Sequence, residues 1–518
     1  MITDLRKPDD VLRTYLVFMV IFMAMAGWVT QVFITYDTEQ MPFTVMWYAL
    51  KASADTPKLW IGASLGTFIG VALAVVIFKY FKTGYNGSYF QTRLKGAYMV
   101  SRASLRSKTK KGKNQLVFGS VEVPQAVEGT HFLAVGSTGV GKSVSIGEYI
   151  ESAINRGDRI ICVDPDGGFM KHFFKEGDKI LNPFDVRGEG WSIFNEIRSD
   201  FDCVQFAISM IPRSPSTEQE AWNSMARTIV SETLHILVKQ GNANAETLLY
   251  WVTKVSMAEL HDLLKDTPAA SCFDAEQTMA SIRTVLTNYV VPHKFLKEGD
   301  FSIRDWLENG TGNLWITWRD DLLQALKPLV SCWVDVICAS VLSMEEDRDR
   351  RIHLIADELD SLEKLNYMID AATKGRKKGL RLAPGIQSFA QLNKTYGEQD
   401  ATTLRGCFRS AFLCGIGDLD NYSAEEASKA LGEHTVIRKE VSSTGGTTGA
   451  KASMSNRSIT ERIVSPTEIH LLPNLTGYLK FAGDYPVCKI KMTYKKRPIV
   501  TEPMIMNEAL HEIVRTKE

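Results

Sequence analysis

Two long apolar stretches dominate the start of the chain. Tyr15 to Ile34 and Leu59 to Phe78 each run for 20 residues without a charged side chain, about the length of helix that crosses a hydrocarbon core of ~30 Å. The first stretch is longer than the ~7–15-residue apolar core of a cleaved signal peptide. The pattern therefore predicts transmembrane helices over 15–34 and 59–78.

Basic residues flank these stretches unevenly. The first stretch is preceded by Arg6, Lys7 and Arg13, and the second is followed by Lys79, Lys82, Arg93 and Lys95. The segment between the two stretches carries more acidic residues (Asp37, Glu39, Asp55) than basic ones (Lys51, Lys58). Because loops rich in Lys and Arg stay on the cytoplasmic side, we expect residues 1–14 in the cytoplasm, 35–58 outside it and the bulk of the chain back in the cytoplasm.

The segment 79–113 is basic as it leaves the second stretch. Residues 93–113, RLKGAYMVSRASLRSKTKKGK, contain no acidic residue. Such a run attracts anionic lipid head groups or a polyanion, although a merely solvated tether has the same composition.

Short apolar runs separated by helical spacing follow. Such a rhythm is typical of an α/β domain with a parallel sheet. The runs are Phe132–Val135, Arg159–Val163, Leu314–Trp318, Ile352–Ala356, Leu380–Ala383 and Ala411–Ile416.

Between the second and third of these runs the strand pattern disappears. Residues 218–241, 243–265 and 274–289 have helical spacing, which predicts an inserted all-α domain. We therefore expect a nucleotide-binding domain in two parts, 114–190 and 302–518, around an all-α domain over 191–301. Residues 442–455 read as a flexible loop by composition, and the segments 435–441, 478–481 and 487–492 as late strands at the edge of the sheet.

The strongest chemical signal follows the run Phe132–Val135. Gly136-Ser137-Thr138-Gly139-Val140-Gly141-Lys142-Ser143 is a complete GxxxxGK[ST] loop between a predicted strand and a predicted helix. Glycines let backbone N–H groups wrap around phosphates. Lys142 is expected to reach the β- and γ-phosphates of ATP, and the Ser143 hydroxyl to bind Mg²⁺.

A second signal ends the run Ile352–Ala356, where Asp357 and Glu358 follow the apolar residues. An acidic pair at such a strand end is the Walker B arrangement. Asp357 is expected to hold the Mg²⁺ shell and Glu358 to polarise the attacking water. His353, inside the run, reads as a core histidine.

Two further candidates lie beyond this pair. Gln387 follows the run that begins at Leu380, and a polar residue there can sense the γ-phosphate. Arg376, in the cluster Lys374-Gly375-Arg376-Lys377-Lys378, is a candidate arginine finger for a neighbouring subunit. A contact with DNA and an ordinary solvated helix end are the alternatives for this arginine.

Composition adds little to this picture. Lys plus Arg and Asp plus Glu both number 60, so the net charge says nothing about nucleic acid. The 8 cysteines are scattered without metal-binding spacing, as in a reduced cytosolic protein.

Taken together, the motifs resemble those of the type IV secretion coupling proteins of conjugative plasmids, over nearly the whole chain. The matching features are the two apolar stretches, the phosphate loop, Asp164-Pro165, Asn182-Pro183-Phe184, the helical insertion, Asp357-Glu358, the Gly375–Gly379 cluster, Gln387-Ser388 with Gln391-Leu392, and the late segments 466–472 and 477–485.

That resemblance implies a RecA-like P-loop NTPase with an all-α domain, anchored in the bacterial inner membrane. It also implies a hexamer that uses ATP and Mg²⁺ to move single-stranded DNA with its relaxase. The partners it implies are DNA, single-stranded first and double-stranded as a further candidate, relaxosome proteins and inner-membrane components of the secretion system.

The sequence departs from the family at two places. Asp166 stands where many relatives have a basic residue, and Pro384-Gly385 is expected to interrupt a strand, because proline donates no ladder hydrogen bond.

Three other functions share part of this pattern. A membrane AAA protease needs HExxH, and His511-Glu512-Ile513-Val514-Arg515 lacks the second histidine. A double-stranded DNA translocase of the same fold and a nucleotide-gated docking platform without motor activity stay open, although Glu358 is not needed by a pure switch.

Overall fold

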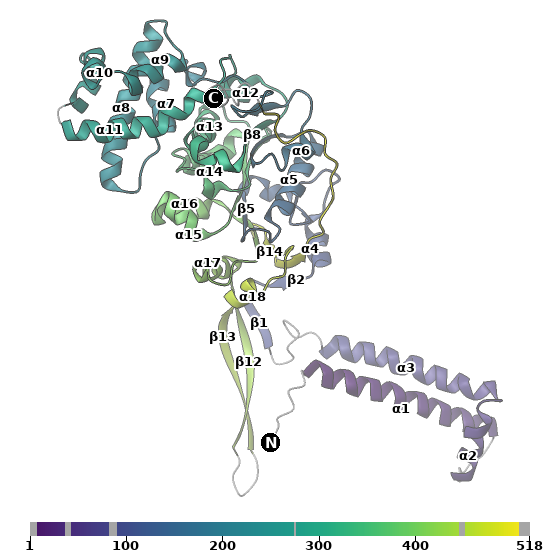
Figure 1. Ribbon diagram of the computed structural model, residues 1–518. Helices are drawn as coiled ribbons and strands as arrows, with labels where there is room; N and C mark the ends of the chain where they lie inside the picture. The colour runs from purple at the N-terminus through teal and green to yellow at the C-terminus, as the bar shows by residue number, and fades with distance from the viewer. Residues whose placement is uncertain (1–7, 37–42, 82–90, 274–275, 445–450, 507–518) are drawn as a thin grey trace, which may run out of the picture. The chain divides into compact units, whose positions relative to one another are not determined.

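The computed structural model describes residues 8–36, 43–81, 91–273, 276–444 and 451–506. The chain divides into two compact units, residues 1–96 with 434–461 and residues 97–433 with 462–518. Figure 1 shows the elements of both units. The candidate motif at His511 lies outside the described residues.

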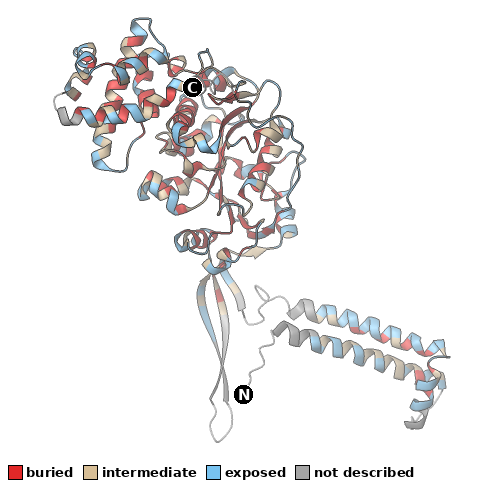
Figure 2. Ribbon diagram, viewed as in Figure 1, coloured by how far each residue is buried: buried red, intermediate tan, exposed pale blue. Residues whose placement is uncertain are grey.

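The first unit begins with three helices, α1 (Pro8–Tyr36), α2 (Phe43–Ala52) and α3 (Pro57–Phe81). Helices α1 and α3 pack so closely that a Cβ on Gly27 would lie 2.2 Å from the carbonyl oxygen of Gly62, an approach that small residues permit in membrane helix pairs. Figure 2 shows few buried residues in the coloured parts of both helices, which are exposed or intermediate over nearly all of that length.

Among the described residues, three helices are long and apolar enough to cross a membrane: Thr14–Tyr36, Pro57–Ile77 and Asp320–Ser343. The first includes the predicted span 15–34, and the second covers all but the last residue of the predicted span 59–78. The third is 78% buried over its most apolar window, against 6% and 17% for the others, and is a core helix of the second unit.

A small sheet also belongs to the first unit. Its strands are β1 (Gln91–Gly96), β12 (Glu433–Thr444) and β13 (Lys451–Arg462), in the order β1-β12-β13. The prediction that residues 435–441 join the edge of the main sheet is therefore wrong, because β12 pairs with β1 instead.

The expected loop over 442–455 is also largely wrong. Residues 442–444 and 451–455 continue β12 and β13, and 445–450 lie outside the described residues. Ser and Thr suit strands as well as loops, so composition did not decide between them.

The second unit is built on a 10-stranded sheet with the order β2-β15-β14-β11-β5-β10-β9-β6-β8-β7. Neighbours from β11 to β7 run parallel, and β14 is antiparallel to both β11 and β15. The strands are β2 (Met99–Val100), β5 (Phe132–Val135), β6 (Arg159–Pro165), β7 (Lys179–Leu181), β8 (Leu314–Trp318), β9 (Ile352–Ala356), β10 (Leu380–Ile386), β11 (Ser410–Cys414), β14 (Thr476–Lys480) and β15 (Val487–Lys491). A separate two-stranded sheet pairs β3 (Val117–Phe118) with β4 (Val121–Glu122).

Both faces of the large sheet are buried, because successive side chains of a strand point to opposite faces. In β5, Leu133 and Val135 join one apolar cluster, while Phe132 and Ala134 join the other. Helix α5 (Lys142–Arg156) packs in the second cluster and α13 (Leu323–Ser343) in the first. The remaining helices of the α/β part are α4 (Arg102–Thr109), α6 (Met170–Phe173), α12 (Ile303–Asn309), α14 (Met368–Lys374), α15 (Phe389–Tyr396), α16 (Glu398–Cys407), α17 (Asn421–Leu431) and α18 (Pro466–His470).

A helical insertion stands between β7 and β8. It contains α7 (Asp200–Met210), α8 (Thr217–Lys239), α9 (Ala245–Leu249), a π-helix (Tyr250–Lys254), α10 (Met257–Leu264) and α11 (Glu276–Val290). The chain enters and leaves it side by side, through a parallel bridge between Trp191 and Phe301. The insertion therefore follows a strand that was not predicted, since the 3 residues of β7 are too few to show a period. The predicted division into domains stays a prediction.

Strand β10 runs through Pro384 and Gly385, so the expected interruption is wrong. Its residues 380–384 pair with β9, and the pairing with β5 begins at Gly385. Pro384 lies where the ladder passes from one neighbour to the other, and there a missing N–H is tolerated.

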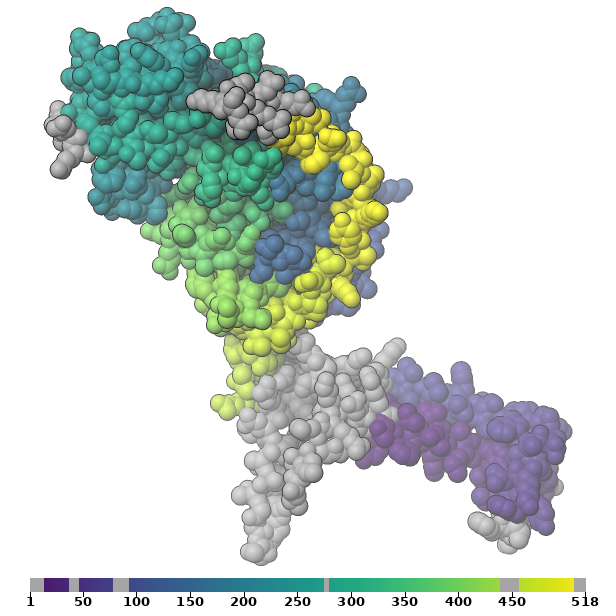
Figure 3. Space-filling model, viewed as in Figure 1, coloured from purple at the N-terminus to yellow at the C-terminus, as the bar shows by residue number. Residues whose placement is uncertain are grey.

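After β15 the chain crosses the surface of the second unit as an extended segment, residues 492–506, which we call the strap. The strap contacts α5 through Arg497 and Glu151, and the 185–188 turn through the hydrogen bond from Val186 N to the Ile505 carbonyl. Figure 3 shows it in yellow over the blue surface of α5 and α6. Nothing in its sequence predicted this course.

Candidate nucleotide-binding site

The glycine-rich loop joins β5 to α5, as predicted. Gly139 has φ +78° with no atom within 4 Å of an added Cβ, and Gly141, before α5, has φ +116°. Both values lie where residues with a side chain are strained. The glycines are thus required by the turn that aims backbone N–H groups at one point in front of α5.

The loop is held by the ends of neighbouring strands. Ser137 N donates to the Gly415 carbonyl at 2.9 Å, and Gly417 N donates to the Ser137 hydroxyl at 2.7 Å. On the other side, Gly136 N donates to the Ile386 carbonyl at 3.2 Å. Strands β10 and β11 therefore fix the shape of the loop.

Lys142 is buried at the first position of α5. Its Nζ donates to the carbonyl oxygens of Gly136 and Ser137 at 2.6 and 3.2 Å. The ammonium group thus lies inside the curve of the loop, where a phosphate chain would also meet the N–H groups.

Ser143 and Asp357 meet across the site. The Ser143 hydroxyl donates to Asp357 Oδ2 at 2.8 Å, while Asp357 Oδ1 is buried without a hydrogen-bond partner in the described part of the chain. Burial raises the pKa of Asp357 to about 6, against the hydrogen bond from Ser143 and the charge of Lys142. An unpaired buried carboxylate oxygen beside a hydroxyl is a donor set that fits Mg²⁺.

No group of three or more His, Cys, Asp or Glu side chains able to hold a metal occurs among the residues described. Where Mg²⁺ binds together with a nucleotide, the protein commonly supplies one or two ligands, and the phosphates and water supply the rest.

Glu358 and Gln387 also lie together. Gln387 Nε2 donates to Glu358 Oε1 at 2.8 Å, and its backbone N–H donates to Asp360 Oδ2 at 2.9 Å. Because β10 lies between β5 and β9, Gln387 emerges between the loop and Asp357. Its predicted role as a sensor of the γ-phosphate stays a prediction.

Two acidic residues that sequence reasoning did not assign stand beside this group. Asp166, with φ +53°, accepts a hydrogen bond from Asp320 N at 3.0 Å. Burial, Asp166 and Glu358 together raise the pKa of the Asp320 carboxyl. Asp320 follows β8, so only the sheet order, which a single sequence does not give, would have pointed to it.

Arg376 lies at the opposite edge of the sheet, before β10 begins. The 7 residues of β10 separate it from Gln387 by roughly 23 Å at ~3.3 Å per residue. Its side chain rests against Gly129, where an added Cβ would lie 2.9 Å from Arg376 Nε. The Arg376 side chain is exposed and forms no hydrogen bond or ion pair with any other described residue. It is too far away to reach the nucleotide of its own chain.

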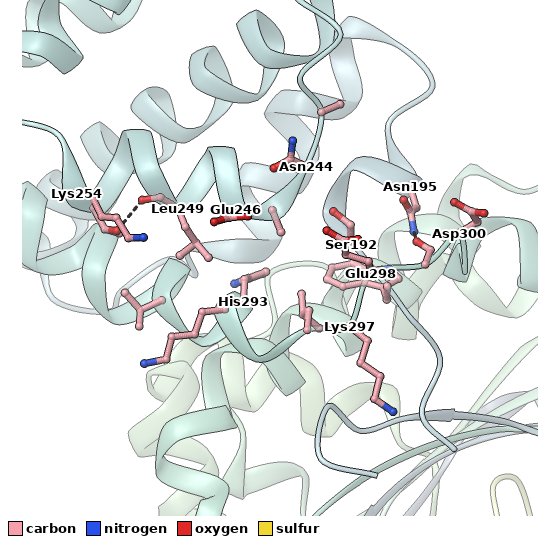
Figure 4. A pocket seen from close by; sticks show the side chains of 18 residues that line it. Ser192, Asn195, Asn244, Glu246, Leu249, Lys254, His293, Lys297, Glu298 and Asp300 are labelled. Atoms are coloured by element: carbon pink, nitrogen blue, oxygen red, sulfur yellow. Dashed lines mark hydrogen bonds between the residues drawn. The ribbon is translucent and has the colours of Figure 1, made fainter. Parts of the chain in front are cut away.

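A cavity of about 790 Å³ lies elsewhere, at the neck of the helical insertion. Figure 4 shows side chains such as Glu246 and Lys254 from the inserted helices and Lys297 from the segment after them around it. None of the residues discussed above for the nucleotide lines this cavity.

Comparison with known proteins defines the class. Residues 115–493 match the family described as the type IV secretion-system coupling protein DNA-binding domain. The chain belongs to this family of coupling proteins, and its fold is that of a RecA-like P-loop NTPase with an all-α part, as the resemblance implied.

Individual relatives sharpen the class. The chain is 31% identical over 408 residues to the coupling protein TraD of Escherichia coli K12, a match covering 75% of this chain and 56% of TraD. The type IV secretion system-coupling protein VirD4 of Bartonella henselae is 20% identical over 383 residues, covering 66% of this chain and 58% of VirD4. The chain thus spans little more than half the length of these curated relatives.

Solved structures agree more fully. The bacterial conjugative coupling protein TrwB, in an unbound form, is 39% identical with a TM-score of 0.77, covering 82% of this chain and 98% of that chain. TrwB in complex with ADP and Mg²⁺ matches with a TM-score of 0.76 and the same identity, over 82% of this chain and 100% of that chain.

Proposed function

We propose that this chain is a DNA-dependent ATPase of the bacterial inner membrane that couples a relaxosome to a type IV secretion channel and pumps single-stranded DNA during conjugation. The proposal rests on two hydrogen bonds at the carboxyl edge of the sheet, one between Ser143 and Asp357 and one between Gln387 and Glu358. A docking platform that only binds nucleotide needs the first pair but not the second.

The residues divide the chemistry between them. The loop from Gly136 to Ser143 would bind the phosphates of ATP, with Lys142 neutralising the β- and γ-phosphates. Ser143 and Asp357 would hold Mg²⁺, which when bound neutralises charge that develops on the phosphates. The family's solved relative TrwB, in complex with ADP and Mg²⁺, supports this assignment.

Glu358 would accept a hydrogen bond from the attacking water and draw its proton away. Gln387 orients the Glu358 carboxylate through the 2.8 Å hydrogen bond and stands between it and the loop. Gln387 is therefore well placed to report the presence of the γ-phosphate to strand β10.

Arg376 would complete the site of a neighbouring subunit. An exposed arginine with no partner within its own described chain, at the sheet edge away from its own nucleotide, is available to another molecule. In a ring of subunits that edge faces the next nucleotide, and an arginine supplied in trans stabilises the charge of phosphoryl transfer. This proposal includes a homohexamer.

The helices α1 and α3 would anchor the ring as two spans, with both ends in the cytoplasm. Only 6% and 17% of their most apolar windows are buried in the chain, and so large an apolar surface is stable only in lipid or against other apolar helices. Inner-membrane components of the secretion system, relaxosome proteins and the relaxase are the partners that this role requires.

ATP hydrolysis by the full chain in lipid nanodiscs, with and without single-stranded DNA, tests the proposal. We expect single-stranded DNA to raise the rate and Lys142→Ala to abolish it. A rate that no nucleic acid changes would favour the docking platform, and stimulation by duplex DNA alone would favour a double-stranded DNA translocase.

A further inference from the structure

His131 occupies an unusual position just before β5. It follows the turn of 3₁₀-helix at residues 125–130 and has φ +56°, in the left-handed region that most side chains avoid. Its side chain is 2% exposed. A residue held in strained backbone and buried there needs a reason in its contacts.

The imidazole joins two elements that are far apart in sequence. Its Nδ1 accepts a hydrogen bond from Leu382 N at 3.0 Å, and its Nε2 lies 2.9 Å from the Ala372 carbonyl oxygen. Since an N–H only donates and a carbonyl only accepts, the ring is the neutral form with its proton on Nε2. Burial lowers the pKa of His131 to about 4, with the charges of Arg376 and Arg381 acting in the same direction.

The first contact takes the place of a backbone hydrogen bond between β10 and the chain just before β5. Strand β10 pairs with β5 at Gly385 and Ile386, opposite Ala134 and Val135. By that register Leu382 stands opposite residue 131, but the backbone carbonyl of His131 accepts from Ser410 N at 3.3 Å, on the β11 side of β5. The side chain supplies the acceptor that the backbone does not.

The second contact holds the helix that leads to Arg376. Ala372 lies in the last turn of α14, where carbonyl groups lack partners within the helix. Two residues before His131, Gly129 provides the surface on which the Arg376 side chain lies. One short segment, 129–131, therefore contacts both the carrier helix and the arginine itself.

We propose that His131 is a positioning residue that fixes Arg376 for the nucleotide of the neighbouring subunit, by tying the end of α14 to strands β5 and β10. This inference rests on the proposed role of Arg376 in trans. Because β10 leads to Gln387 in the subunit's own site, the same side chain links the two edges of the sheet.

Two substitutions separate the two hydrogen bonds. In His131→Asn the amide oxygen can still accept from Leu382 N, but the side chain does not reach Ala372. In His131→Gln the amide nitrogen can reach the Ala372 carbonyl. We expect His131→Asn to lower ATP hydrolysis at saturating single-stranded DNA by about 10- to 100-fold, as for a small displacement of a catalytic group, and His131→Gln to keep most of it.

Mixing subunits in the full-length assembly gives the deciding readout. A Lys142→Ala subunit has a dead site but an intact Arg376, so mixing it with His131→Asn should give a rate above the sum of the two separate rates. Mixing His131→Asn with Arg376→Ala should give no rate above that sum, because both subunits lack a well-placed arginine. A lesion in the His131 subunit's own site would show the reverse pattern and overturn the inference.

The mixture of Arg376→Ala with Lys142→Ala is the reference. If it regains activity and the His131→Asn mixture with Lys142→Ala does not, the inference about His131 fails alone. If the reference itself stays inactive, Arg376 does not act in trans and both ideas fall. Should His131→Asn not fold, His131→Gln decides, because a folded His131→Gln protein without hydrolysis contradicts the proposal.

Discussion

The two edges of the parallel sheet carry their polar side chains in opposite ways. At the carboxyl edge, Ser143, Asp357, Glu358 and Gln387 are paired in a compact group with one buried carboxylate oxygen left over. At the amino edge, Arg156, Asp158 and Glu128 are buried in a closed network, while Arg376 stands exposed against Gly129.

That closed network reaches the helix of the phosphate loop. The Tyr149 hydroxyl of α5 is hydrogen-bonded to His353 Nδ1 at 2.8 Å, and His353 Nε2 to Asp158 Oδ2 at 2.9 Å. Arg156 forms ion pairs with both Asp158 and Glu128. Buried charges of this kind are kept when every member is satisfied. The carboxyl edge is thus built to receive a ligand, while the amino edge is a rigid support on which Arg376 lies exposed.

The largest expected effect comes from removing that arginine. Arg376→Ala should lower ATP hydrolysis by about 10³-fold, the lower range for an arginine finger, while leaving nucleotide affinity near normal because the residue does not touch its own site. Hydrolysis and binding of a fluorescent ATP analogue measure the two quantities. Lys374→Ala, which removes an exposed lysine paired with Asp370, is the matched control.

Glu358→Gln should be next, with a loss of about 10²-fold or more, as for removal of a general base. The amide keeps the shape and leaves the phosphates bound, so the variant should trap ATP rather than lose it. Single-turnover hydrolysis with quantified bound nucleotide checks this. Weakened ATP binding with an unchanged rate of hydrolysis would contradict the assignment of Glu358 as the residue that activates the attacking water.

Much of the carboxyl edge could be predicted from sequence. The loop and the pair Asp357-Glu358 each follow a short apolar run, and the runs 132–135, 314–318 and 352–356 match strands residue for residue. His353 is the buried core histidine that its position indicated. Local signals sufficed because each motif is continuous in the chain.

The amino edge could not be predicted in this way. The support of Arg376 by His131 and Gly129 joins segments about 250 residues apart, and the strap and Asp320 depend on sheet order in the same way. Composition also misled at Pro384, where register decides whether proline fits, and at residues 442–455, where Ser and Thr continue two strands.

A smaller loss of hydrolysis is expected when a side chain is added to the surface on which Arg376 lies. Gly129→Ala places a Cβ 2.9 Å from Arg376 Nε, so the arginine must shift, and we expect hydrolysis to fall by about 10-fold. Gly406→Ala, which meets nothing within 4 Å, should leave the rate unchanged. Equal rates for the two variants would show that the resting place of Arg376 does not matter.

The smallest effect concerns acid stability. Burial lowers the pKa of both His131 and His293 to about 4, below the usual 6.5. The unfolded chain takes up these protons between pH 6.5 and 4 while the folded chain does not, so stability falls as pH falls, by up to about 3 kcal/mol per histidine. Thermal unfolding midpoints from pH 7 to 5 should drop less in His293→Gln than in the unmodified chain.

The most direct test of the account is a structure of the full chain assembled on single-stranded DNA with a non-hydrolysable ATP analogue and Mg²⁺. We expect the Arg376 guanidinium within hydrogen-bond distance of the γ-phosphate held by Lys142 of the neighbouring subunit. An Arg376 that instead contacts the DNA backbone, or points into solvent with the γ-phosphate bound, would contradict the claim that the amino edge of one subunit completes the carboxyl edge of the next.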